Sequence, residues 1–158
     1  GKEASGAGNM KLMMNGAVTI GTLDGANVEM FEQLGADNMF LFGLHADEAE
    51  ALRAAGYDPQ AYVRRSPWLG RVLERMSRGY ADGESYADLV SSLLYGGDPY
   101  LRLADFDDYA ATHERLYAAI ADPAARARLS LGNIARSGIF AADRAVREYA
   151  ERIWEVHA

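Results

Sequence analysis

A single lysine follows a glycine-rich turn near the start of the chain. Lys11 is the only charged residue between Glu3 and Asp24, and residues 5–8 before it read SGAG. Main-chain N–H groups of such a turn, at the start of a helix, can bind a phosphate. A lysine amine about one helical turn later can form a Schiff base with an aldehyde. The two features fit the two ends of a phosphorylated aldehyde, of which pyridoxal phosphate is the common biological example.

A purely structural role for Lys11 competes with this chemistry. Lysines near a helix start commonly extend their amine to solvent, and a short Gly-x-Gly motif is weak evidence for phosphate binding. However, Lys2 and Lys11 are the only lysines among sixteen basic residues, and a desolvated lysine supplies the neutral amine that arginine cannot. The small residues Ala7 and Gly8 leave space beside Lys11 for a bulky group. The residues alone leave both alternatives open.

Glycines and apolar runs predict the elements that would position Lys11. A helix is expected over residues 8–15, ended by Gly16, and the scarcity of charge predicts that it is largely buried. A short strand at 17–21 and a helix at 27–34, capped by Asn27, follow. Residues 39–43 are continuously apolar, which predicts a strand buried on both faces, as parallel strands are.

The rest of the chain is predicted to be helical, with a break at residues 96–99. The expected helices span residues 46–55, 68–78, 86–95, 106–121, 123–134 and 143–157. Because a two-stranded parallel sheet covers neither its faces nor its edges, we expect the C-terminal part of a larger protein. The predicted fold class is α/β and predominantly helical, one fragment with an α/β part at 1–56 and a helical part at 57–158.

Composition excludes several classes of function. The net charge of −7 argues against a nucleic-acid-binding surface, and no apolar run is long enough to predict a membrane span. The chain has no cysteine, which excludes disulfides and thiolate metal sites and fits a cytoplasmic protein.

Other polar and aromatic residues are predicted to be structural. They are His45, His113 and His157, the carboxylates Asp24, Glu29, Asp105, Asp107 and Asp108, and the aromatic residues Tyr95, Tyr100, Phe106, Tyr109 and Trp154. The histidines are too scattered for a metal site or a catalytic triad. The carboxylates lie near helix starts, where they favour the helix dipole. The aromatic residues are expected in the core, with Trp154 as a packing anchor on the last helix.

The segment around Lys11 resembles a known family. Residues 3–15, EASGAGNMKLMMN, are similar to the pyridoxal-phosphate attachment signature of the α-glucan phosphorylases, the glycogen, starch and maltodextrin enzymes. The resemblance continues through IGTLDGANVE at 20–29 and GGDPY at 96–100. It is visible again in Asp143-Arg144, Tyr149 and Ile153-Trp154. It covers essentially the whole chain and matches only the C-terminal end of a phosphorylase.

The resemblance implies an activity and a cofactor. The full protein would be a glycosyltransferase that cleaves α-1,4-glucan with inorganic phosphate to give glucose 1-phosphate, and this chain would be the C-terminal portion of a Rossmann-like domain in its two-domain architecture. Lys11 would hold pyridoxal 5′-phosphate as a Schiff base, and Ala7 and Gly8 would face the cofactor phosphate through their N–H groups. The cofactor phosphate would relay a proton, while Lys11 would serve as an anchor.

The resemblance also implies substrate contacts and a missing partner. Glu3 would bond sugar hydroxyls, and Ser5 and Gly6 would line the same glucosyl subsite. The family usually has threonine where this chain has Ala7, so we expect cofactor binding to be weaker by about 1 to 3 kcal/mol. The family's phosphate-binding cations and its N-terminal domain lie upstream of Gly1, so the fragment alone is expected to be inactive. The last helix, without that domain, would expose an apolar face and favour self-association.

The alternative is a standalone helical structural or interaction module that keeps the signature without catalysis. A natural reading frame beginning near Gly1 would favour this alternative, and the sequence immediately upstream would discriminate between the two.

Overall fold

The computed structural model describes residues 5–156. In chain order its elements are α1 (Gly6–Met14), β1 (Ile20–Gly21), α2 (Ala26–Leu34), β2 (Phe40–Leu41), α3 (Ala46–Ala54), α4 (Pro59–Arg65), α5 (Pro67–Arg78), α6 (Ala87–Leu94), α7 (Arg102–Ala121), α8 (Pro123–Arg136), the 3-10 turn η1 (Ser137–Phe140) and α9 (Ala142–Arg152). The chain divides into two compact units. Unit 1 comprises the residues up to Leu41 and those from Glu114 onwards, and unit 2 comprises Phe42–His113. Whether they belong to a single C-terminal domain of a longer protein stays a prediction.

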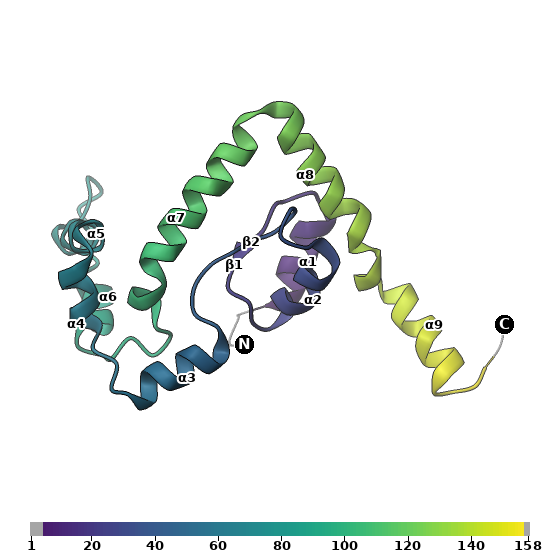
Figure 1. Ribbon diagram of the computed structural model, residues 1–158, viewed down its shortest axis with the longest axis horizontal. Helices are drawn as coiled ribbons and strands as arrows, with labels where there is room; N and C mark the ends of the chain where they lie inside the picture. The colour runs from purple at the N-terminus through teal and green to yellow at the C-terminus, as the bar shows by residue number, and fades with distance from the viewer. Residues whose placement is uncertain (1–4, 157–158) are drawn as a thin grey trace. The chain divides into compact units, whose positions relative to one another are not determined.

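The two strands form a small parallel sheet in unit 1. Ile20 lies opposite Phe40 and Gly21 opposite Leu41, and α2 connects the strands (Figure 1). The predicted α/β, predominantly helical class is confirmed. The prediction that residues 39–43 are buried on both faces is wrong, because only Met39 is buried and the others are half-buried. A sheet of two short strands is too small to be covered fully on both faces.

Methionines build the core of unit 1. Met13 of α1, Met30 of α2 and Met39 before β2 are each at most 1% exposed, and Leu34 completes the cluster. Met14, the next residue along α1, is 47% exposed. One side of α1 is therefore packed into the unit, and the other side is left at the surface.

Unit 2 is a set of short helices with its own core. The core residues are Leu69, Leu73, Val90 and Leu103. Helix α5 begins with Ser66, whose hydroxyl accepts a hydrogen bond from Leu69 N at 3.3 Å, followed by Pro67 at the first helical position. Helix α4 was not predicted, although Asp58 and Pro59 start it in the same way.

The carboxylates near the start of α7 bind main-chain and hydroxyl donors of earlier segments. The bonds are Asp105 Oδ1 with Leu44 N (2.9 Å), Asp108 Oδ2 with Gly43 N (2.6 Å) and Asp107 Oδ1 with Ser66 Oγ (2.6 Å). Helix α7 begins at Arg102, four residues before the predicted start, so the three residues lie inside the helix. These contacts give the carboxylates a structural role, and within residues 5–156 no three histidine or carboxylate side chains gather as a metal site would require.

A buried carboxylate fixes the GGDPY segment. Asp98 is fully buried with a φ of 41°, and its Oδ2 accepts from Tyr57 OH at 2.9 Å and from Leu103 N at 2.8 Å. Burial, followed by the hydrogen bond and the charge of Asp98, raises the pKa of the Tyr57 hydroxyl above its usual value of 10.0. The folded chain therefore favours the neutral phenol.

This shift predicts a loss of stability at alkaline pH. Because the folded-state pKa of Tyr57 is raised, its contribution is fully present below pH 10, and it falls above pH 10 as the phenol of the unfolded chain ionises. At pH 8 the wild type should be about 1 kcal/mol more stable than Tyr57→Phe, which lacks the hydrogen bond. Urea unfolding at pH 8 and at pH 11 should show this advantage shrinking. A constant difference between the two proteins would contradict the prediction.

The last helix exposes much of its apolar surface. Val146 and Tyr149 are 55% and 51% exposed, and Ile153, the C-cap residue, is 65% exposed. Trp154 lies beyond the end of α9 and is 60% exposed, so the prediction that it packs as an anchor on the helix is wrong for the described residues. The centroid of its ring lies 6.2 Å from that of Tyr149.

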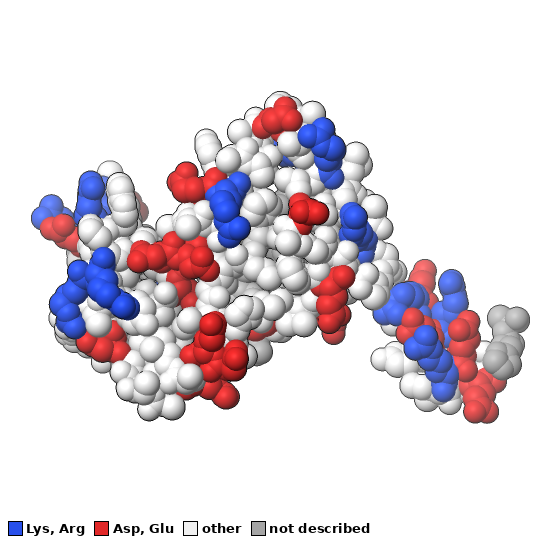
Figure 2. All heavy atoms as spheres, viewed as in Figure 1, with Lys and Arg blue, Asp and Glu red and all other residues white. Residues whose placement is uncertain are grey.

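Three of the other aromatic residues are also exposed rather than in the core. Tyr95, Tyr100 and Tyr109 are 76%, 49% and 39% exposed, whereas Phe106 packs against the core of unit 2. Tyr95 and Tyr100 lie on either side of the break at 96–99, between the end of α6 and the start of α7. On the face drawn in Figure 2, acidic and basic side chains are interspersed. Among the described residues, no helix combines the length and the apolarity that crossing a membrane requires.

Candidate functional site

The lysine-bearing helix starts directly after Ser5. Ser5 has an extended backbone and is the N-cap of α1, and its hydroxyl accepts from Gly8 N at 3.2 Å. The helix therefore begins at Gly6, two residues before the predicted start. Ala7 and Gly8 lie in its first turn, where N–H groups have no helical carbonyl to bind.

The two faces of α1 differ sharply. Asn9 and Met13, four residues apart, lie on the side that packs into unit 1: Met13 is fully buried, and Asn9 Nδ2 donates to Asn27 Oδ1 at 3.2 Å. Lys11 is two residues from each of them, about 200° around the helix. Its side chain is accordingly exposed. The expectation of a largely buried helix is wrong, because the apolar residues of α1 are divided between both faces, with Leu12 59% exposed.

The C-terminal end of α1 is capped by a side chain and lies close to α8. Asn15 is the C-cap, and its Nδ2 donates to Lys11 O at 2.7 Å. Gly16 has a φ of +80°, and a Cβ added there would lie 2.1 Å from the hydroxyl oxygen of Ser130 in α8. A larger residue at position 16 would strain this backbone and require the Ser130 side chain to move, so the glycine predicted as a helix stop also permits a close approach to α8.

These residues fit an aldehyde cofactor in part. The exposed amine of Lys11 is accessible, and Ala7 and Gly8 lie three to four residues before it, on the same side of the helix. The Gly8 N–H, however, already donates to Ser5. A phosphate at this helix start would have to share or displace that bond. The donor set thus suits the anchoring of an aldehyde, while the phosphate would be met by main-chain groups and the helix dipole.

The structure brings most of the predicted site residues together in one short segment. Ser5, Gly6, Ala7, Gly8 and Lys11 all belong to α1 or its N-cap. Glu3 lies outside the described residues, as does His157.

The remaining histidines lie in unit 2 and take local roles. His45 is the N-cap of α3, and its main-chain N–H donates to Glu48 Oε2 at 2.8 Å. The ring of His113 lies 5.9 Å from that of Tyr109. His45 thus caps a helix, and His113 is exposed beside an exposed tyrosine, and neither lies near the predicted site residues in the sequence.

Sequence reasoning missed the role of Asn27. The prediction that Asn27 caps α2 is wrong: the N-cap is Gly25, with a φ of 51°, and Asn27 lies inside the helix. Its Nδ2 donates to Thr22 O at 3.0 Å, while its Oδ1 accepts from Asn9. Glycine supplies the left-handed backbone at position 25, so the amide of Asn27 is not needed as a cap. The sequence carries no local signal for this contact, because its two asparagines are 18 residues apart.

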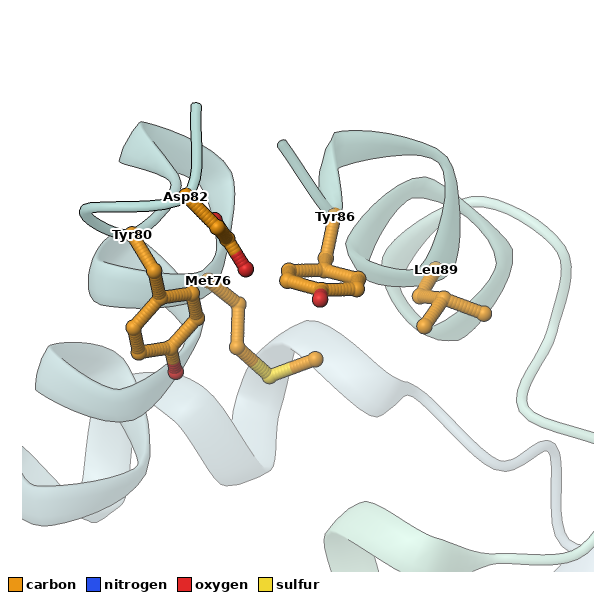
Figure 3. A pocket seen from close by; sticks show the side chains of 5 residues that line it. All are labelled: Met76, Tyr80, Asp82, Tyr86 and Leu89. Atoms are coloured by element: carbon orange, nitrogen blue, oxygen red, sulfur yellow. The ribbon is translucent and has the colours of Figure 1, made fainter. Parts of the chain in front are cut away.

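An open pocket of about 560 Å³ lies in unit 2 (Figure 3). It is lined by Met76, Tyr80, Asp82, Tyr86 and Leu89. The two tyrosine rings meet edge to face at 5.7 Å, and Asp82 Oδ1 accepts from the main-chain N–H of Glu84. The pocket contains no nucleophile with a neighbouring base and none of the residues predicted from the signature. It shares no residue with the candidate cofactor site on α1.

Comparison with known proteins identifies the same family over nearly the whole chain. A family model described as carbohydrate phosphorylase matches residues 1–156. Over 159 aligned residues, the chain is 47% identical to the glycogen phosphorylase of Synechocystis sp.. It is 42% identical to the glycogen phosphorylase of Chlamydia pneumoniae and to the muscle form of glycogen phosphorylase of Homo sapiens. Each alignment covers 99% of this chain and 19% of the relative. The chain therefore spans about a fifth of the length of these relatives.

Proposed function

Because the chain belongs to the carbohydrate phosphorylase family, we propose that it is the C-terminal part of an α-1,4-glucan phosphorylase. The full protein would transfer glucosyl units from glycogen, starch or maltodextrin to inorganic phosphate, giving glucose 1-phosphate. The observation that carries the proposal is Lys11: it is exposed on a short helix, directly after a glycine-rich helix start, within the signature of the family.

Each residue of the segment has a proposed task. Lys11 anchors pyridoxal 5′-phosphate, and the Ala7 and Gly8 N–H groups face its phosphate. Glu3, Ser5 and Gly6 contact the glucosyl unit. The cofactor, when bound, supplies a phosphate group that relays a proton to and from inorganic phosphate. The exposed position of Lys11 leaves room for the cofactor ring beside α1, which supports this assignment.

The rest of the site is proposed to come from the remainder of the longer protein. The chain spans 19% of its relatives, and α1 contributes a single cation. Two adjacent phosphates need several preorganised positive groups, so the chain alone should be inactive. We propose that it completes a Rossmann-like domain, opposite a separate N-terminal domain, in a cytoplasmic enzyme.

Covalent labelling tests the proposal. The protein, at the length its gene encodes, is incubated with pyridoxal 5′-phosphate, reduced with borohydride and digested, and the peptides are analysed by mass spectrometry. A pyridoxyl group on Lys11, together with phosphate-dependent release of glucose 1-phosphate from maltodextrin, is the expected result. A protein of the relatives' length that carries no label on Lys11 would refute the assignment.

Restoring the family's threonine at position 7 should tighten cofactor binding. Ala7 is exposed in the first turn of α1, so a threonine hydroxyl there can donate to the cofactor phosphate without disturbing the core. We expect Ala7→Thr to lower the Kd for pyridoxal 5′-phosphate by about fivefold or more, equivalent to about 1 to 3 kcal/mol. Fluorescence titration measures the change. Ala7→Val, nearly isosteric but without the hydroxyl, is the matched control and should give no gain.

A second candidate, a helical module that self-associates, is favoured by the exposed apolar residues of α9 and its C-cap residue Ile153. In that case Ile153→Asp should convert a concentration-dependent dimer to a monomer in sedimentation experiments. A wild-type chain that stays monomeric at all concentrations would exclude this candidate.

A further inference from the structure

Asn27 connects the lysine-bearing helix to the strand and helix that follow it. Its Oδ1 accepts from Asn9 Nδ2 of α1 at 3.2 Å, and its Nδ2 donates to Thr22 O, just after β1, at 3.0 Å. The residue itself lies in α2 and is buried, at 9% exposure. One amide group thus connects α1, the end of β1 and α2.

The orientation of this amide is determined by its partners. Thr22 O is a carbonyl and can only accept, so the NH₂ group of Asn27 must face it. The oxygen of Asn27 then faces Asn9, which must donate. The donor and acceptor roles in the chain Asn9–Asn27–Thr22 are therefore fixed, and the bond between Asn9 and Asn27 links α1 to α2 in one orientation of the amide.

Space around Asn27 is also restricted. A Cβ added at Gly21 would lie 2.6 Å from Asn27 Nδ2, so β1 approaches the amide as closely as glycine allows. Thr22 Oγ1 in turn donates to Asp24 Oδ1 at 2.8 Å, which holds the turn that presents the carbonyl. The amide therefore has little freedom to shift along β1.

We propose that Asn27 is a positioning residue for Lys11, acting through Asn9. Asn9 lies about 200° around α1 from Lys11, so the bond to Asn27 sets the rotation of the helix about its axis. That rotation decides where the Lys11 amine points, about one helix diameter away from the bond. The inference rests on the proposed function only in naming pyridoxal 5′-phosphate as the group that the amine meets.

The test compares cofactor affinity with stability in the protein at its encoded length. Asn27→Ala and Asn9→Ala should each raise the Kd for pyridoxal 5′-phosphate about tenfold, because even a small misplacement of the Lys11 amine weakens its reaction with the cofactor. In the double variant the two effects should not add, since both remove the same bond. Asn9 is only half-buried, so Asn9→Ala keeps the inference testable where Asn27→Ala fails to fold.

Asn133→Ala is the matched control. Asn133 is a fully buried asparagine of unit 1 whose Nδ2 donates to Asn38 O and Leu129 O, neither of them in α1. It should lower the Tm at least as much as Asn9→Ala while leaving the Kd within twofold of the wild-type value. An equal loss of affinity in Asn133→Ala and Asn9→Ala, or an unchanged Kd in Asn9→Ala, would overturn the inference. A wild-type protein that takes no pyridoxyl label on Lys11 would instead overturn the proposed function itself.

Discussion

Under the proposed function, replacing Lys11 with arginine in the protein at its encoded length is expected to abolish pyridoxyl labelling at position 11 and, with it, phosphorolysis of α-1,4-glucans. The guanidinium group stays protonated at any accessible pH and cannot attack an aldehyde as a free amine. The substitution keeps the positive charge and the exposed position of the side chain on α1, so the fold should be unaffected. Borohydride reduction and peptide mapping, with circular dichroism to check folding, measure both consequences.

Lys2→Arg is the matched control for this experiment. Lys2 and Lys11 are the only lysines of this chain, so the two exchanges decide which of these positions carries a label that peptide mapping finds within it. The Lys2→Arg protein should be labelled as fully as the wild type. Label that persists in Lys11→Arg and disappears in Lys2→Arg would move the attachment site and refute the role proposed for Lys11.

Met13→Ala should be among the most destabilising substitutions in unit 1. Met13 is fully buried in the cluster with Met30, Leu34 and Met39. Truncating it leaves a cavity between α1 and α2, and such changes cost about 2 to 5 kcal/mol of unfolding free energy. Urea unfolding followed by circular dichroism, without cofactor, measures the loss.

The neighbouring methionine provides the comparison. Met14 is 47% exposed, so Met14→Ala removes similar atoms from a site that water already reaches. Its effect should stay within about 1 kcal/mol. Equal losses of unfolding free energy in Met13→Ala and Met14→Ala would show that α1 does not pack into unit 1 by the face that carries Met13.

Local signals in the sequence predicted most helices well. Gly35 and Gly79 end α2 and α5 where expected, and Pro123 starts α8. Each of these helix boundaries is determined by a few neighbouring residues. A glycine allows a left-handed backbone at the end, or a proline fits the first helical turn at the start. The start signal of α4, Asp58 followed by Pro59, is of the same kind and was overlooked.

Burial was predicted less well, because it depends on what packs against each element. Residues 40–43 are apolar yet half-buried, and Tyr95 and Trp154 are exposed. The candidate site shows the same difference between local signals and contacts made in the fold. The residues around Lys11 are contiguous and could be located from helical spacing, whereas the bond between Asn9 and Asn27 joins residues 18 apart. Nothing in the local pattern predicts such a pairing.

Unit 1 is discontinuous in sequence, and this affects the order in which the protein can form during synthesis. Asn133 Nδ2 donates to Asn38 O, 95 residues earlier, and Gly16 packs closely on Ser130. The ribosome therefore releases the lysine-bearing helix long before the α8 residues against which it rests. The intervening Phe42–His113 segment is a compact unit; if it folds first, it shortens the loop that must close and lowers the entropic cost of closure. A nascent chain stalled before residue 123 would carry Lys11 on a helix without its support, so cofactor attachment should follow the synthesis of the C-terminal helices.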